Sequence, residues 1–269
     1  MEIIHLTDPH FGDPQPAFDI HVLAKALNEL KHLFCRKDTY LVLSGDVSYQ
    51  GREHGYALAQ RFIADTWICH GGERSRFLAC PGNHDLCNER FDAFDAFTYG
   101  VRRDHRLTYE REPSHVVEFD DVVFLCVNSA YHRDYKYGLV DDTVITRQLV
   151  GLEKIAKRKV AVVHHHILGV FRDDTSAIRN ALQLITLLDK YNFEILIHGH
   201  QHAQADVVLG ESKIKVYSGR SLNFTTRGLV NGLAIYSSDD QGAWSRTIKV
   251  LSNDASLATG QAFFTAEKK

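Results

Sequence analysis

The sequence is poor in cysteine and has little excess charge of either sign, and both features exclude classes of protein. Its five cysteines are odd in number and lack C-x-x-C spacing, which argues against a disulfide framework and against a thiolate zinc site. The formal net charge of −3 provides no global basic field that would attract nucleic acid nonspecifically. A local basic patch remains compatible with this balance.

Long apolar runs are also absent. No stretch approaches the roughly 18 consecutive apolar residues of a membrane span, and the first residues, M-E-I-I-H-L-T-D, show neither a basic region nor an apolar leader segment. We therefore expect a cytoplasmic protein without a membrane partner. Hydrophobic residues make up 44% of the 269 residues, which is ordinary globular usage. We expect one domain over residues 1–252 and a loosely held tail over residues 253–269, which are small and polar.

Short apolar runs rich in β-branched residues predict buried strands at residues 2–6, 40–43, 77–78, 122–127, 160–163 and 195–197. Between them, apolar residues recur at helical spacing, which predicts helices near residues 20–34, 53–69, 141–157 and 176–190. Alternating strands and helices indicate an α/β fold with a mainly parallel sheet.

The pattern changes after Asp206, where strand-like runs at residues 213–217, 232–236 and 247–251 alternate with turns and no helix is evident. We interpret this part as a second sheet that packs face to face with the first. Residues 88–117 mix charges with aromatics, and we expect them to form a helix and a loop beside the functional site.

Histidine is abundant, with 16 residues, and much of it is clustered. The motifs D-P-H, S-G-D-V, P-G-N-H-D, H-H-H and H-G-H-Q-H each follow a predicted strand. Ligands in open α/β sheets bind at the carboxyl ends of strands, so these five motifs are expected to converge there. The candidate metal ligands are Asp8, His10, Asp46, Asn83, His200, His202 and one of the run His164 to His166.

The types of ligand indicate the kind of metal. Imidazole and carboxylate groups without thiolate favour Mn, Fe or Zn over Ca or Mg. Seven candidates exceed the three or so protein ligands of one catalytic ion, so we expect two divalent ions bridged by one carboxylate. Ions roughly 3.5 to 4 Å apart can polarise a phosphoryl group together, and a metal-bound hydroxide can then attack the phosphorus in line with the leaving oxygen.

The ordered motifs D-x-H, G-D, G-N-H-D, His and G-H-x-H resemble those of the calcineurin-like metallophosphoesterase superfamily, and they extend from Asp8 to His202. The resemblance implies a four-layer α/β/β/α sandwich, with two mixed sheets and flanking helices. It also implies that one ion is bound by Asp8, His10 and His202, the other by Asn83, His200 and a histidine of the triple run, with Asp46 as the bridge.

Two assignments within the site follow from the same resemblance. The first histidine after the strand is usually the ligand in similar proteins, which favours His164. The family commonly has proline after this run, where the present chain has Ile167, so His165 stays an alternative ligand or a substrate contact. His84 corresponds to the catalytic imidazole that contacts the phosphate, and Asp85 is the candidate carboxylate that keeps His84 protonated.

Candidate substrate contacts lie outside these motifs. Arg220, in S-G-R-S, has a guanidinium that can match phosphate oxygens bidentately. Tyr131 belongs to S-A-Y-H-R-D-Y-K-Y, where aromatics interleave with basic residues and can stack a nucleobase. An ordinary solvated loop is an equal alternative for both residues.

The resemblance also bears on the substrate. The Ser/Thr protein phosphatase branch typically carries G-D-x-V-D-R-G, whereas this chain has G-D-V-S-Y-Q-G, without the arginine and the second acid. The chain is more similar to small bacterial phosphodiesterases of the class III cyclic-nucleotide type, which implies a small phosphodiester or nucleotide as substrate. The alternatives are a nuclease or nucleic-acid end-processing enzyme, and a non-catalytic scaffold that binds proteins. The oligomeric state is left open.

Overall fold

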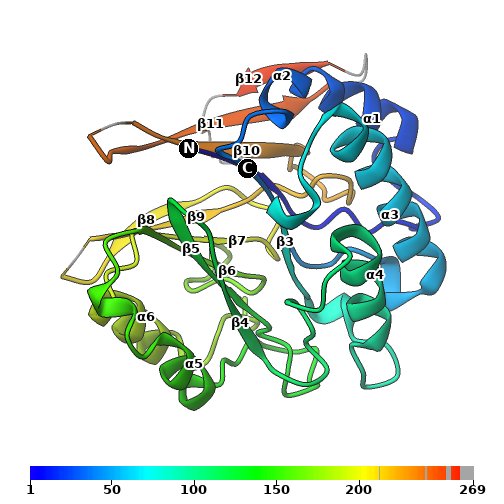
Figure 1. Ribbon diagram of the computed structural model, residues 1–269. Coiled ribbons are helices and arrows are strands. Elements are labelled where there is room, and N and C mark those ends of the chain that lie inside the picture. The colour runs from blue at the N-terminus through cyan, green and yellow to red at the C-terminus, as the bar shows by residue number, and fades with distance from the viewer. Residues whose placement is uncertain (212, 240, 253–255, 261–269) are drawn as a thin grey trace.

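Two sheets face each other in the computed structural model, which describes residues 1–211, 213–239, 241–252 and 256–260 (Figure 1). The first sheet has the order β12 (Leu257–Gly260), β11 (Trp244–Leu251), β10 (Gly232–Ser238), β1 (Glu2–Leu6), β2 (Thr39–Ser44) and β3 (Phe77–Cys80). The second has the order β4 (Ser114–Glu118), β5 (Val122–Val127), β6 (Arg158–Val163), β7 (Ile195–His198), β9 (Ile214–Ser218) and β8 (Asp206–Leu209).

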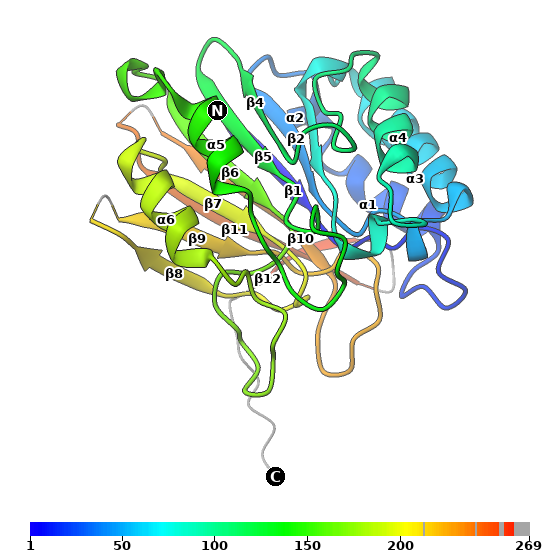
Figure 2. The ribbon, with the colours of Figure 1, turned by 90° about the horizontal axis from the view of Figure 1, so that it is seen from below.

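Helices cover the outer faces of both sheets (Figure 2). Beside the first sheet lie α1 (Ile20–Asn28), α2 (Lys31–Phe34), α3 (Glu53–Thr66) and α4 (Asp92–Arg102). Beside the second lie α5 (Asp142–Leu149) and α6 (Ala181–Lys190). The expected four-layer α/β/β/α sandwich with two mixed sheets is confirmed. No helix of the described residues is both long enough and apolar enough to cross a membrane.

Strand β5 shows how the sequence builds two apolar layers. Its alternate residues face opposite sides of the sheet, and all of them are buried because both sides are covered. Phe124 points toward the first sheet, where its ring centroid lies 5.1 Å from that of Tyr40 on β2. Val123 and Leu125 point the other way and pack in a second cluster with Ile145 of α5. The core between the sheets therefore holds them together, and the outer cluster attaches the helices.

The division of strands between the sheets differs from the sequence-based expectation. Strands before and after Asp206 do not form separate sheets: β1, β2 and β3 join the late strands β10 to β12, while β4 to β7 join β8 and β9. Strand β10 returns antiparallel along β1, pairing Glu2 with Ser237. An apolar run indicates that a strand forms but carries no information on its partner, so the pattern along the chain could not reveal this exchange.

Several element boundaries also differ. The helix expected over residues 141–157 ends at Leu149, because Gly151 adopts a left-handed φ of 90°. The one expected over residues 20–34 is split into α1 and α2, and the one over residues 176–190 begins only at Ala181. Residues 88–117 form α4, a connecting loop and most of β4. Within the expected tail, Leu257–Gly260 pairs with β11, and residues 253–255 and 261–269 lie outside the described part.

Candidate metal centre

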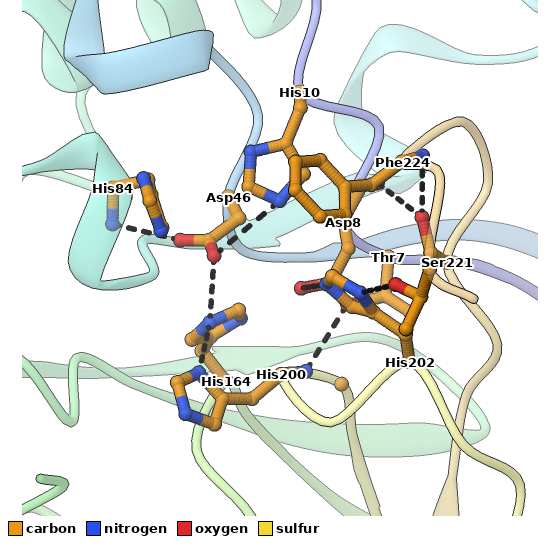
Figure 3. A network of polar contacts seen from close by, with 12 residues as sticks. Thr7, Asp8, His10, Asp46, His84, His164, His200, His202, Ser221 and Phe224 are labelled. Atoms are coloured by element: carbon orange, nitrogen blue, oxygen red, sulfur yellow. Dashed lines mark hydrogen bonds and ion pairs between the residues drawn. The ribbon is translucent and has the colours of Figure 1, made fainter. Parts of the chain in front are cut away.

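The five loops that carry the histidine and aspartate motifs meet at one edge of the two sheets, after β1, β2, β3, β6 and β7 (Figure 3). Backbone hydrogen bonds join them side by side. Asp8 N donates to Gly45 O at 3.1 Å, and His10 N donates to Asp46 O at 3.0 Å. Gly199 N donates to His164 O at 3.1 Å. Residues far apart in sequence thus have fixed neighbours at this edge.

Five of the candidate ligands have a left-handed backbone, which non-glycine residues seldom adopt. They are Asp8, His10, Asp46, His200 and His202, with φ between 43° and 74°. Such conformations cost free energy and persist where the surroundings enforce them, commonly at functional sites. The residue types carry no signal of this feature, so sequence reasoning missed it.

The side chains form two groups that are each able to hold a cation. Within each group, every residue offers a ligand atom within 4.8 Å of the others; the groups are Asp8, His10 and His202, and Asp46, His164 and His200. Asp46 connects them, because its Oδ2 lies 3.2 Å from His164 Nε2 and 3.7 Å from His10 Nε2 (Figure 3). One carboxylate oxygen therefore faces both groups, which places Asp46 where it can bridge two ions.

The hydrogen bonding of these residues tests whether divalent ions fit here. Asn83 Oδ1 and both ring nitrogens of His10 are buried without a hydrogen-bond partner, and Asp8 Oδ1 has His202 Nε2 beside it at 3.2 Å. Such atoms are costly to bury unless something else satisfies them, and a divalent cation does so. Imidazole nitrogens with carboxylate and amide oxygens also suit Mn, Fe or Zn. The residues fit two divalent ions.

His164 lies in the second group, while His165 does not. The Nδ1 of His164 lies 2.8 Å from Ser44 O, an acceptor, so Nδ1 carries a hydrogen, and Nε2 is the nitrogen that can bind a cation once it has released its own proton. His165 is buried on the other side, with its Nδ1 2.7 Å from Ser129 Oγ. Its ring centroid lies 4.5 Å from that of His200. The geometry favours His164 as the ligand, while His165 packs against His200 and stays a prediction as a substrate contact.

Charges in the site are balanced between carboxylates and imidazoles. Burial alone would raise the pKa of Asp46, but the neighbouring imidazoles of His164 and His84 hold it well below its ordinary value. Burial lowers the pKa of His164, yet Asp46 outweighs this effect and raises it to about 9. Burial lowers the pKa of His10 to about 4 and, together with His164, that of His200 to about 3. His10 and His200 are therefore neutral near pH 7, the form that binds metals.

His84 lies beside the two ligand groups. Its backbone N–H donates to Asp46 Oδ1 at 2.8 Å, and its half-buried ring lies edge-on to that of His10 with centroids 5.0 Å apart (Figure 3). The His84 ring belongs to neither ligand group of the described chain. The imidazole thus stands next to the ion sites without being one of their ligands.

The expected pairing of Asp85 with His84 is wrong. Asp85 is fully buried, and its carboxylate accepts hydrogen bonds from Gly82 N at 2.9 Å, Val47 N at 3.0 Å and Tyr56 Oη at 2.9 Å. Residues 83–85 form a 3₁₀ turn, which points neighbouring side chains in different directions. Asp85 therefore ties the loops after β2 and β3 together.

The predicted substrate contacts lie apart from the candidate ligands in the hydrogen-bond network. Arg220 donates through Nε to Gln204 Oε1 at 3.0 Å, and Tyr131 packs beside His132 with ring centroids 5.9 Å apart. The same tyrosine-rich segment contacts the loop after β3 through Tyr135, whose hydroxyl donates to Leu86 O at 2.8 Å, two residues after His84. Tyr131 stays a prediction as a substrate contact, since no contact of the described residues tests it.

Gly45 shows why the loops require glycine. It has a φ of 91°, and a Cβ at this position would lie 2.4 Å from Nδ1 of His164 and 2.8 Å from Gly82 N. The residue before the bridging Asp46 must therefore lack a side chain for both backbone and packing reasons.

The sandwich and its paired ligand groups define a two-metal hydrolase. The chain belongs to the calcineurin-like phosphoesterase family, whose model matches residues 1–204. It is accordingly a metal-dependent phosphoesterase of the dimetal type, as the order of its motifs indicated.

Solved structures share the fold at low sequence identity. A dimetal phosphatase from Danio rerio has a TM-score of 0.63 at 11% identity and covers 98% of this chain and 99% of its own. GAP50, the anchor in the inner membrane complex of Plasmodium, has a TM-score of 0.57 at 12% identity and covers 100% of this chain and 90% of its own. A 5'-nucleotidase precursor from Thermus thermophilus has a TM-score of 0.57 at 14% identity and covers 95% of this chain and 55% of its own. No curated protein sequence matches the chain.

Replacing the bridging carboxylate is expected to disturb both ions. Asp46→Asn keeps the shape of the side chain but removes the charge that faces both groups. We expect fewer than two ions per chain after loading with excess Mn and dialysis, measured by elemental analysis. Asp65→Asn changes an exposed carboxylate on α3 and serves as the control. Two tightly bound ions in Asp46→Asn would refute the bridge.

Gly45→Ala and Gly151→Ala form a matched pair, because both glycines have φ near 90° and only Gly45 is crowded. Each variant should lose about 1 to 2 kcal/mol of unfolding free energy from backbone strain. Gly45→Ala should lose about 1 to 3 kcal/mol more from overpacking against His164. Urea unfolding of the metal-free proteins measures the difference, and equal losses would contradict the close approach.

Proposed function

We propose that this chain hydrolyses small phosphodiesters, with cyclic nucleotides as the first candidates. One observation carries the proposal: the Asp46 carboxylate faces both ligand groups through Oδ2 and accepts the backbone N–H of His84 through Oδ1. The bridge between the ions and the position of a non-ligand imidazole are thus set by one side chain. This arrangement suits a reaction at a phosphorus that both ions and the imidazole contact at once.

When bound, two divalent ions supply Lewis acidity for the phosphoryl group and make water a better nucleophile. The protein residues provide the rest. The two ligand groups would fix where the phosphate lies, and His84, beside His10, would present its imidazole to the leaving oxygen. A protonated His84 stabilises the negative charge that develops there as the bond to phosphorus breaks.

The charge of the site favours a diester over a monoester. Near neutral pH a phosphomonoester carries about 1.5 to 2 negative charges, because its second pKa is about 6, while a diester carries one. A dianion calls for additional cationic groups, yet no arginine contacts a candidate ligand within the described residues. The segment G-D-V-S-Y-Q-G lacks the arginine of the protein phosphatase branch, and Arg220 is held by Gln204.

A nuclease or end-processing activity is the second enzymatic candidate. The same two-metal centre can cleave a nucleic-acid diester, and the loop that carries Tyr131 and Tyr135 flanks the site with basic and aromatic residues. The net charge of −3 does not favour polyanion binding. A scaffold role is the candidate from another class, because GAP50 is described as an anchor and shares the fold. The complete set of ligand types together with His84 supports catalysis instead.

The metal and the compartment are further parts of the proposal. Mn, Fe or Zn is the expected ion, because the ligand set is mixed imidazole and oxygen. The five cysteines are all free in the structure, which supports a reducing compartment such as the cytoplasm.

His84→Ala should separate catalysis from metal binding. We expect both ions to stay bound, since the backbone N–H that contacts Asp46 is retained, while kcat on bis(p-nitrophenyl) phosphate with Mn falls roughly 100- to 10,000-fold through loss of acid catalysis. Asp85→Asn retains an acceptor for the loop N–H groups and should lower kcat far less. Unchanged turnover in His84→Ala would remove His84 from the mechanism.

A substrate panel with Mn tests the substrate class. Cyclic nucleotides, glycerophosphodiesters, single-stranded DNA and RNA, and monoesters are compared by kcat/KM. We expect the small diesters to exceed the monoesters and the polymers. Preference for polymers would support the nuclease, and two bound ions without hydrolysis of any ester would support the scaffold.

A further inference from the structure

The segment between β6 and α6, residues 164–180, extends beyond the sheets at the edge that carries the metal centre (Figure 2). One polar residue of this segment, Ser176, contacts the second ligand group from outside, and Asp174 in turn contacts Ser176. Ser176 Oγ lies 2.9 Å from Nε2 of His200, on the opposite side of the ring from Nδ1, which lies 3.1 Å from His164 Nε2.

The hydrogen of the Ser176 hydroxyl has a definite acceptor. Ser176 Oγ donates to Asp174 Oδ1 at 2.5 Å, and Ser176 N donates to the same oxygen at 2.9 Å. A serine hydroxyl has one hydrogen, and an ionised carboxylate only accepts. The oxygen of Ser176 is therefore left as an acceptor for His200, so the hydrogen of the imidazole must lie on Nε2.

This assignment determines which nitrogen of His200 can bind a metal. A neutral imidazole with its hydrogen on Nε2 has its free lone pair on Nδ1. The Nδ1 atom faces into the group with Asp46 and His164, while Nε2 faces Ser176. The pair of Asp174 and Ser176 thus selects the tautomer in which His200 presents a metal-binding nitrogen to the site.

Asp174 is itself held by two residues, one near His164 in the sequence and one next to His200. Its Oδ2 lies 2.5 Å from His166 Nε2 and accepts a hydrogen bond from Gln201 Nε2. His166 follows His164 by two residues, and Gln201 is next to His200. Gln201 also accepts the backbone N–H of Val170 at 3.0 Å. The segment is therefore fastened to the ends of β6 and β7, the two strands that precede His164 and His200.

We propose that Ser176, held by Asp174, is a positioning residue that fixes the orientation and tautomer of His200 and thereby strengthens binding of the ion in the second group. Outer partners of this kind raise the basicity of a metal-bound imidazole and typically account for roughly 10- to 100-fold in metal affinity. The inference rests on the two-metal centre of the proposed function, but it does not depend on the substrate.

Calorimetry on the full chain measures the affinity of each of the two Mn binding steps. Elemental analysis after dialysis measures how many ions stay bound. Ser176→Ala should weaken one of the two binding steps roughly 10- to 100-fold. Ser176→Thr, which keeps the hydroxyl, should restore most of the affinity. Thr175→Ala changes the exposed hydroxyl next along the segment and should bind both ions as the wild type does.

Asp174 provides a second readout of the same chain of contacts. Asp174→Ala should weaken the same binding step, and the double variant with Ser176→Ala should be no weaker than the worse single variant, because both changes break one chain of contacts. Asp173→Ala, at the exposed neighbouring carboxylate, is its control. A purely structural role would give additive losses and lower the thermal stability of the metal-free variants in parallel.

The outcomes separate this inference from the proposed function. Wild-type affinity at both steps in Ser176→Ala, or no rescue by Ser176→Thr, would overturn the positioning role and leave the two-metal centre intact. A wild-type chain that binds fewer than two ions would overturn the metal centre and the positioning role together. The role of Ser176 would be supported by three results together. Ser176→Ala weakens one binding step, Ser176→Thr restores it, and the loss does not add to that of Asp174→Ala.

Discussion

The contact on which the rest of the site depends is the position of the Asp46 carboxylate between two sets of imidazoles. One of its oxygens faces His164 and His10, and the other accepts the backbone N–H of His84. Burying this charge is unfavourable unless positive groups surround it, and the neighbouring imidazoles and the expected ions provide them. Asp46 can occupy this position only because Gly45 and Gly82 let the loops approach closely.

The fold explains how residues from five distant motifs reach this carboxylate. Parallel strands end at the same edge of each sheet, and the two sheets face each other so that the loops after β1, β2 and β3 meet those after β6 and β7. The core between the sheets, where Phe124 packs against Tyr40, therefore also holds the two halves of the site in register. Damage to that core is expected to reach the metal centre without any change in a ligand.

Much of the site can be predicted from the sequence, and the gaps have physical reasons. The rule that ligands bind at strand ends brings Asp8, Asp46 and His200 together, because each motif follows its strand directly along the chain. Side-chain direction within a tight turn is not encoded in adjacency, which is why the pairing of Asp85 with His84 is wrong. Ser176 carries no signal at all, since a loop serine acquires its role only through the fold that brings it to His200. The exchange of strands between the sheets is hidden for the same reason, because pairing is a tertiary property.

The central claim is that two ions bind at this centre with Asp46 between them. Anomalous diffraction from crystals of the Mn-loaded chain measures this directly, because each bound Mn gives a separate peak. We predict two peaks roughly 3.5 to 4 Å apart on either side of the Asp46 carboxylate, one beside Asp8, His10 and His202 and the other beside His164 and His200. A single peak, or two peaks that Asp46 does not bridge, would contradict the account.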